Sequence, residues 1–134
     1  MKTLIALAAA STLALGAAPV SAETPAERAE ARLAERLEGR TAGEPQSCIT
    51  VMNSNKLEVV ERIGLVYEQG DTIWVARTTS PNQLRFDDIP IIERMGSQLC
   101  RQDVMRTVDR STGSFTGALF LEDFVPYTRT DAEG

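Results

Sequence analysis

Residues 65–77, LVYEQGDTIWVAR, carry the clearest structural signal in this chain. Two apolar runs, at residues 65–69 and 72–77, flank the dipeptide Gly70-Asp71. This dipeptide is typical of a two-residue β-hairpin turn, because glycine readily takes the positive φ of the first turn position. We therefore predict an antiparallel hairpin with Gly70 and Asp71 at its tip.

The two-residue turn also sets the register of the predicted hairpin. It places Tyr67 opposite Trp74 and Val66 opposite Val75, and the two pairs lie on opposite faces. Both faces of the hairpin then carry apolar side chains. Such a strand pair is either covered on both sides or uses its outer face for contact with another molecule.

Further short strands are predicted around the hairpin, because the composition after Cys48 shifts toward Val, Ile, Thr and aromatic residues. They lie at residues 49–52, 57–60, 89–94, 103–109, 115–121 and 125–128. The run at 89–94 contains Pro90, which cannot donate to a ladder, so it is an edge strand at best.

Residues 47–129 are therefore expected to form one small, mainly β domain. We predict an antiparallel barrel or curled sheet of about six short strands, since closure removes exposed edges. Residues 130–134 are expected to form a disordered polar tail.

A helix is predicted at residues 24–38. Thr24 can cap it, Pro25 suits its first position, and Glu27 completes a capping box. Gly39 can end the helix. Residues 40–46 follow as a linker, so residues 23–46 are expected to form a helix and linker.

The apolar line of this helix, Ala26, Ala29, Leu33 and Leu37, contains only two large side chains. Such a face buries little surface, so we expect the helix to pack loosely, project from the domain or fray. The alternatives are a partner-binding arm and a weakly attached leader helix.

Residues 1–22 have the composition of an export signal. A positive start at Lys2 precedes an apolar stretch at residues 4–18, and Val20-Ser21-Ala22 supplies the small residues of a cleavage site. We predict cleavage after Ala22, a periplasmic location and no stable membrane insertion. A retained membrane anchor is the alternative, although a spanning helix needs roughly 20 strongly apolar residues.

The predicted mature chain is small and acidic. The full chain of 134 residues has 14 basic residues, 19 acidic residues and no histidine. Removing residues 1–22 takes away Lys2 and no acid, which leaves 112 residues and a net charge of minus six. This charge repels phosphate backbones, so we expect no nucleic-acid partner.

The two cysteines, Cys48 and Cys100, are expected to form one disulfide, because exported chains usually oxidise an even number of cysteines. The closed loop would contribute roughly 4 kcal/mol by chain entropy. A redox pair is the alternative, but it calls for a close spacing that these two cysteines lack.

The absence of histidine removes the usual general base and the commonest zinc ligand. Ser54 and Lys56 lie in a polar turn, where they are ordinary surface residues. No phosphate-binding loop or calcium loop is present, and we expect no metal and no cofactor.

Carboxylates are the remaining candidates for catalysis. Asp103, Asp109 and Asp123 are the least implausible acids, although aspartates at turns and strand ends usually serve the backbone. Asp87 and Asp88 are adjacent and should point to opposite sides of an extended segment, which argues against a catalytic pair.

Seven aromatic residues are present, and a domain of this size needs most of them inside. Tyr67 and Trp74 form the pair that we single out as a possible exposed contact patch. Packing in the core is the alternative for both.

Several short pieces lie along residues 48–127: Cys48-Ile49, Ile63-Gly64-Leu65-Val66-Tyr67, Gly96-Ser97-Gln98-Leu99-Cys100, Val108-Asp109-Arg110 and Phe124-Val125-Pro126-Tyr127. With these pieces the chain resembles a family of small exported proteobacterial proteins of unknown function. The resemblance implies a periplasmic, disulfide-bearing, mainly β module and implies no catalytic residue.

The leading functional hypothesis is a non-catalytic periplasmic module that binds a protein or an envelope component. A more specific version is an inhibitor of a cationic envelope hydrolase, which follows from charge and fold analogy. The alternatives are a small carboxylate-dependent hydrolase and a structural accessory protein of the envelope.

Overall fold

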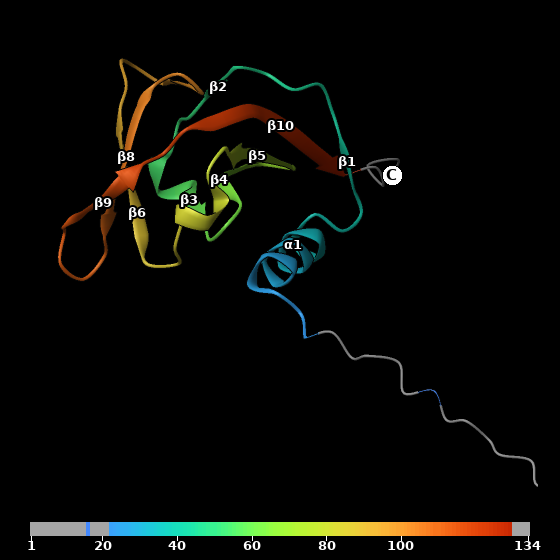
Figure 1. Ribbon diagram of the computed structural model, residues 1–134. Coiled ribbons are helices and arrows are strands. Elements are labelled where there is room, and N and C mark those ends of the chain that lie inside the picture. The colour runs from blue at the N-terminus through green and yellow to red at the C-terminus, as the bar shows by residue number, and fades with distance from the viewer. Residues whose placement is uncertain (1–15, 17–21, 130–134) are drawn as a thin grey trace, which may run out of the picture.

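The computed structural model of the protein describes residue 16 and residues 22–129 (Figure 1). Most of the predicted export signal and the whole predicted tail at 130–134 lie outside the described residues. The described part contains one α-helix, α1 (Pro25–Arg36), and ten β-strands. The strands are β1 (Arg40–Ala42), β2 (Cys48–Thr50), β3 (Leu57–Val60), β4 (Gly64–Gln69), β5 (Thr72–Thr78), β6 (Asp88–Glu93), β7 (Gln98–Cys100), β8 (Val104–Asp109), β9 (Phe115–Ala118) and β10 (Leu121–Arg129).

The strands form three antiparallel sheets. The largest has the order β1-β10-β5-β4-β3, and two smaller sheets have the orders β2-β7 and β6-β8-β9. The mainly β, antiparallel prediction is confirmed, but no sheet among residues 22–129 closes into a barrel. The largest sheet ends at the short strands β1 and β3, and short edge strands offer little surface for pairing with another chain.

Ten strands form where about six were predicted: all eight runs named in the sequence form strands, and β1 and β7 are added, because such short segments acquire partners only in the folded chain. Residues 40–46 were expected to be linker, yet β1 pairs with β10 through Arg40↔Arg129 and its neighbours. β7 was not among the predicted strands either, and it pairs with β2.

The predicted hairpin is confirmed in position and register. β4 and β5 pair Tyr67 with Trp74 and Val66 with Val75. Gly70 has a φ of 58°, the positive value that the turn requires. Pro90 also lies where expected, because β6 pairs only with β8 and is an edge strand.

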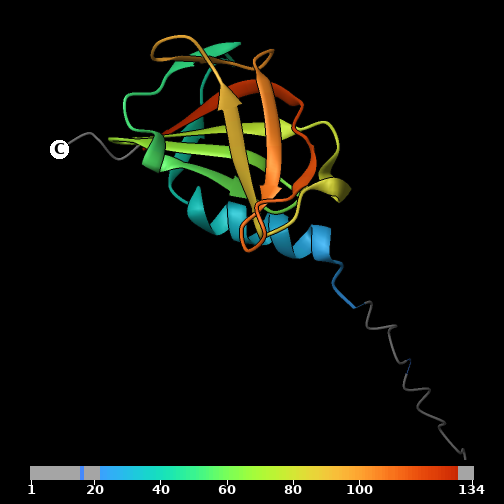
Figure 2. The ribbon, with the colours of Figure 1, turned by 90° about the vertical axis from the view of Figure 1, so that its left-hand side faces the viewer.

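The largest sheet is covered on both faces. Figure 2 shows α1 beside the sheet of β3, β4 and β5, while β6 and β8 run across those strands. The core between the sheets contains Ile49, Val51, Leu65, Tyr67, Ala76, Leu84, Leu99, Met105, Leu119, Leu121 and Phe124. The core beneath the helix contains Ala29, Leu33, Ile63, Val66, Ile73 and Val75.

Helix α1 begins as predicted, since Thr24 and Glu27 form a reciprocal capping box and Pro25 occupies the first turn. The expectation of a loose or projecting helix is wrong. Leu33 is only 3% exposed and packs with Ala29 against the outer face of the hairpin. The sheet supplies the apolar surface that the helix lacks. The sequence of the helix alone does not reveal this contribution of the sheet.

Ion pairs also join the helix to the sheet. Arg36 Nη1 lies 3.0 Å from Glu58 Oε2 on β3, and Arg77 Nη2 on β5 donates to Glu30 Oε2 at 3.1 Å. These pairs flank the apolar contact of Leu33. Helix α1 is therefore held at its edges and along its centre.

Candidate functional site

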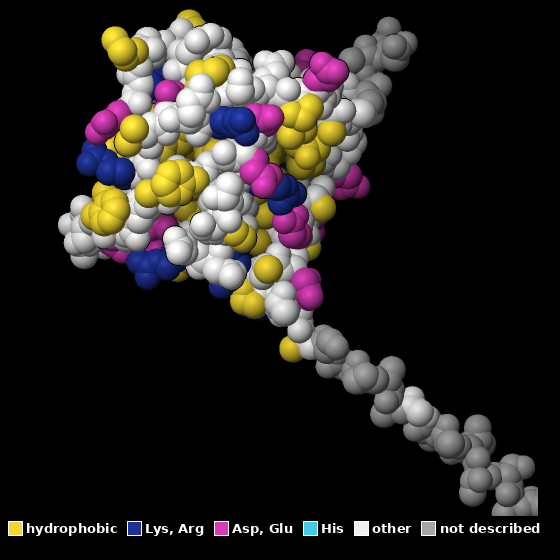
Figure 3. Space-filling view, turned by 45° about the horizontal axis from the view of Figure 1, so that its top comes forward, with side chains coloured by type: hydrophobic (Ala, Val, Ile, Leu, Met, Phe, Trp, Pro, Cys, Tyr) yellow, Lys and Arg dark blue, Asp and Glu magenta, His cyan; other side chains and the backbone are white. Residues whose placement is uncertain are grey.

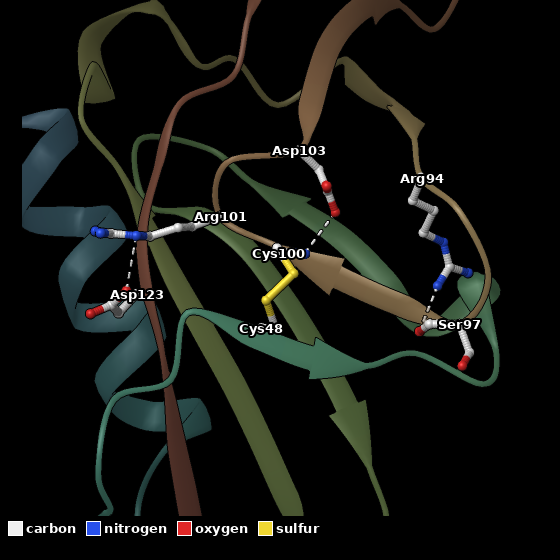
Figure 4. Close-up of a disulfide and its surroundings, with 7 residues drawn as sticks. All are labelled: Cys48, Arg94, Ser97, Cys100, Arg101, Asp103 and Asp123. Carbon is white, nitrogen blue, oxygen red and sulfur yellow. Dashed lines mark hydrogen bonds and ion pairs between the residues drawn. A yellow bond between two sulfur atoms is a disulfide. The ribbon is translucent and has the colours of Figure 1, made fainter.

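The predicted disulfide between Cys48 and Cys100 is present (Figure 4). The two cysteines are directly opposite each other in the ribbon of β2 and β7, which has three residue pairs. The backbone N–H of Arg101 donates to Ser47 O at 2.8 Å and extends the ribbon by one step. The bridge thus fastens a two-stranded sheet that is too short to be stable alone.

The charged side chains around the bridge are engaged in local structure. Asp103 Oδ2 accepts a hydrogen bond from the backbone N–H of Cys100 at 2.7 Å. Arg94 Nη1 donates to Ser97 O at 2.9 Å, and Arg101 Nε lies 3.2 Å from Asp123 Oδ1 (Figure 4). A hollow of about 640 Å³ lies beside Cys100, but the arginine in its wall is already committed to backbone carbonyls.

The suggested contact patch of Tyr67 and Trp74 does not form. Tyr67 is 2% exposed, and its hydroxyl accepts a hydrogen bond from the backbone N–H of Met52 at 3.2 Å. Trp74 is half-buried and packs against the same core. This face of the hairpin is covered by the smaller sheets, so the alternative of core packing is the correct one.

Three phenylalanines are exposed instead. Phe86 is 75% exposed, Phe115 68% and Phe120 64%. The other four of the seven aromatic residues are buried or half-buried, as expected for most of them, whereas these three lie at an edge strand or in loops. Figure 3 shows hydrophobic side chains at the surface among acidic and basic ones.

The three candidate catalytic acids each have a structural partner. Asp103 and Asp123 are held as described above. Asp109 Oδ1 accepts hydrogen bonds from the backbone N–H groups of Thr112 at 2.9 Å and Ser111 at 2.8 Å. These bonds, that of Thr112 first, lower the pKa of Asp109 below its ordinary value, because they stabilise the ionised carboxylate.

Asp87 and Asp88 have different surroundings. Asp88 is 2% exposed, and its carboxylate accepts hydrogen bonds from the backbone N–H of Arg85 at 2.9 Å and from Thr116 Oγ1 at 2.8 Å. Asp87 Oδ1 lies 3.6 Å from Arg85 Nε. Among the described residues, no group of three or more His, Cys, Asp or Glu side chains could hold a metal ion.

A cleft of about 490 Å³ lies between residues 25–32 of α1, the end of β3 with the turn that follows it, and the loop before β6. We call it the arginine cleft. Its lining comprises Pro25, Arg28, Ala29, Arg32, Glu58, Val59, Val60, Glu61, Arg62 and Phe86. It therefore combines three guanidinium groups with several apolar side chains.

Arg28 and Arg32 are the uncommitted cations of this cleft. They are four residues apart on α1, which places them on the same face of the helix. Both are exposed, and neither side chain makes an ion pair or hydrogen bond with any described residue. By contrast, the nearby Arg36 pairs with Glu58.

Arg62 is held in place by the turn between β3 and β4. It has a φ of 61°, which is unusual for a residue other than glycine. Its backbone N–H donates to Leu84 O at 3.2 Å, and its Nη1 donates to Asn82 Oδ1 at 3.2 Å. Its Nε is buried and makes no hydrogen bond within the described structure, and it forms an ion pair with Glu61 Oε1 at 4.0 Å.

Comparisons with protein-family models, with curated proteins and with solved structures find no match to this chain.

Within residues 22–129, no helix is long and apolar enough to cross a membrane. Ala22, the predicted last residue of the export signal, is exposed next to the capping residues of α1.

The sequence contains part of the signal for the arginine cleft. The spacing of Arg28 and Arg32 on a predicted helix already places two cations side by side. Arg62 and Phe86 are far from that helix in the sequence and reach it only through the packing of α1 on the sheet. Sequence analysis therefore missed this site.

Proposed function

We propose that this protein is an exported, periplasmic, non-catalytic binding module that uses the arginine cleft to hold an envelope component. The observation that carries the proposal is the contrast between charged side chains that have hydrogen-bond or ion-pair partners and the two arginines that have none among the described residues. The candidate catalytic acids accept hydrogen bonds from backbone amides or form ion pairs. The guanidinium groups of Arg28 and Arg32, in contrast, form neither an ion pair nor a hydrogen bond with any described residue.

Two features support an exported location in this proposal. The first 22 residues have the composition of a signal peptide, and a disulfide persists best outside the reducing cytosol. The same proposal includes kinship with the small exported proteobacterial proteins that residues 48–127 resemble. Expression of the full chain in a Gram-negative host should yield periplasmic protein that begins at Glu23.

The experiment for binding is affinity capture with the mature, oxidised protein from a periplasmic and membrane extract. We expect one component to be retained reproducibly, without chemical change on prolonged incubation. A hydrolytic activity that disappears with one substitution among Asp103→Asn, Asp109→Asn and Asp123→Asn would instead establish a carboxylate-dependent enzyme.

A further inference from the structure

We infer that the arginine cleft binds a small organic oxyanion, meaning a carboxylate or phosphate group attached to an apolar body. Arg28 and Arg32 would bind the oxyanion, and Phe86 would pack against the apolar part. This inference rests on the proposed function and names its ligand class. No residue outside the cleft is needed for it.

The charge of the cleft is opposite to that of the protein as a whole. The chain has a net charge of −5, yet three arginines line this one cleft. Its two glutamates do not cancel the charges of Arg28 and Arg32, because Glu58 is paired with Arg36 at 3.0 Å and Glu61 with Arg62 at 4.0 Å. Guanidinium groups match carboxylates and phosphates with parallel hydrogen bonds, so the free guanidinium pair favours such a group.

Arg62 indicates that the cleft is formed before a ligand arrives. Its backbone has a strained, positive φ, and its guanidinium is already fixed by Asn82. Strained backbone conformations persist only where the surrounding structure holds them, and they are concentrated at functional sites. A cation fixed in advance loses less conformational freedom when an anion binds.

The remaining wall of the cleft is apolar, and it is exposed at Phe86 and Pro25, half-buried at Val60 and buried at Ala29. Phe86 is 75% exposed, and Pro25, Ala29 and Val60 also line the space. Inorganic phosphate alone would leave this surface in contact with water. A ligand with an aromatic or aliphatic body would cover it, and an aromatic body could also stack beside a guanidinium group.

The volume limits the size of the ligand. About 490 Å³ lies within the range of roughly 300 to 1,000 Å³ that is usual for small-molecule sites. A folded protein partner would need a much larger contact surface. The ligand is therefore a free organic anion or the headgroup region of an anionic lipid, which share the same chemistry.

The test uses the mature, disulfide-bonded protein and three probes: phenyl phosphate, inorganic phosphate and phosphatidylglycerol vesicles. Affinities are measured by calorimetry, and the site is located by amide NMR shifts. We expect phenyl phosphate to bind more tightly than inorganic phosphate, with shifts at the cleft. Both affinities should fall as salt is raised, because the cations are exposed.

Two variants and two matched controls locate the interaction. Arg28→Gln combined with Arg32→Gln should weaken phenyl phosphate binding by about tenfold or more. Phe86→Ala should remove the advantage of phenyl phosphate over inorganic phosphate. Arg110→Gln and Phe120→Ala replace exposed residues outside the cleft lining and should bind like the native protein.

The vesicle measurement distinguishes the two sources of the ligand. Vesicle binding that is lost in the double arginine variant would identify a lipid headgroup, and phenyl phosphate binding without vesicle binding would identify a soluble anion. The inference is overturned if neither probe binds, or if the double variant binds both as the native protein does. Unchanged circular dichroism and melting temperature show that each variant is folded.

The inference and the proposed function can fail separately. If the double arginine variant still captures the same envelope component, the protein remains a non-catalytic binding module, but the inference fails and with it the placement of the binding site in the arginine cleft. If the native protein shows a carboxylate-dependent hydrolytic activity instead, the proposed function itself fails.

Discussion

Removal of the disulfide should reduce the stability of the whole domain and not only of the ribbon that it joins. The perturbation is Cys48→Ala combined with Cys100→Ala. The bridge links residues separated by 52 positions, so its loss lets the unfolded chain explore many more conformations. In the folded variant, β2 and β7 are joined by at most their three backbone residue pairs.

The expected loss follows from the length of the closed loop. A loop of this size corresponds to roughly 4 kcal/mol in the free energy of unfolding, by the chain-entropy relation. A domain of ordinary stability has about 5 to 15 kcal/mol in total. The melting temperature should therefore fall by roughly 15 °C, taking about 4 °C per kcal/mol for a domain of this size.

Urea denaturation of the mature protein, followed by tryptophan fluorescence from Trp74, measures this difference. The matched control is Thr50→Ala combined with Gln98→Ala, an exposed opposing pair two positions along the same ribbon. It should cost at most about 1 kcal/mol, the usual upper value of a cross-strand pair. If the double cysteine variant unfolds at the same urea concentration as this control, the entropy argument is refuted.

Three further predictions concern other parts of the fold. Gly64→Ala should lower the free energy of unfolding, measured by urea denaturation, by about 2 to 4 kcal/mol, because its added methyl group would overlap the backbone carbonyl of Ala76 on β5. Gly113 also has a positive φ but lies in open space, so Gly113→Ala should lower it by only about 1 kcal/mol. Leu33→Ala should cost about 3 kcal/mol, since it empties the core beneath α1; a loss near zero would mean that the helix is loosely attached after all. Folding lowers the pKa of Asp109, chiefly through the hydrogen bond from the amide of Thr112. The ionised carboxylate therefore stabilises the fold at pH values above its unfolded-state pKa. This stabilisation disappears as the pH falls through the folded-state pKa. Asp109→Asn should therefore be less stable than the native protein at neutral pH and equally stable in strong acid, and an equal deficit at both pH values would contradict the assignment.

Local chemistry was sufficient to predict several elements. The hairpin turn at Gly70 and the capping box from Thr24 to Glu27 depend on residues within four positions of each other. Their geometry is set by short-range hydrogen bonds and backbone preferences, which a single sequence displays. The edge position of Pro90 was predictable for the same reason, because a missing N–H is a property of that residue alone.

Long-range packing decided the rest. The burial of Tyr67 depends on which layer covers its face of the hairpin, and the tight packing of Leu33 depends on the apolar face that β4 and β5 present to it. Neither surface can be recognised until both partners are placed. The same holds for the arginine cleft, where Arg62 and Phe86 meet the helix across the fold.

By itself the sequence determined the mainly β composition, the hairpin register, the helix start and the pairing of Cys48 with Cys100. Each of these follows from backbone preferences, turn chemistry or the count of one residue type. Only the tertiary structure decided the three open sheets, the two separate cores and the meeting of Arg28 with Phe86 in one cleft. The physical reason is that burial and charge pairing depend on what lies on the other side of each surface, and that is a property of the folded chain.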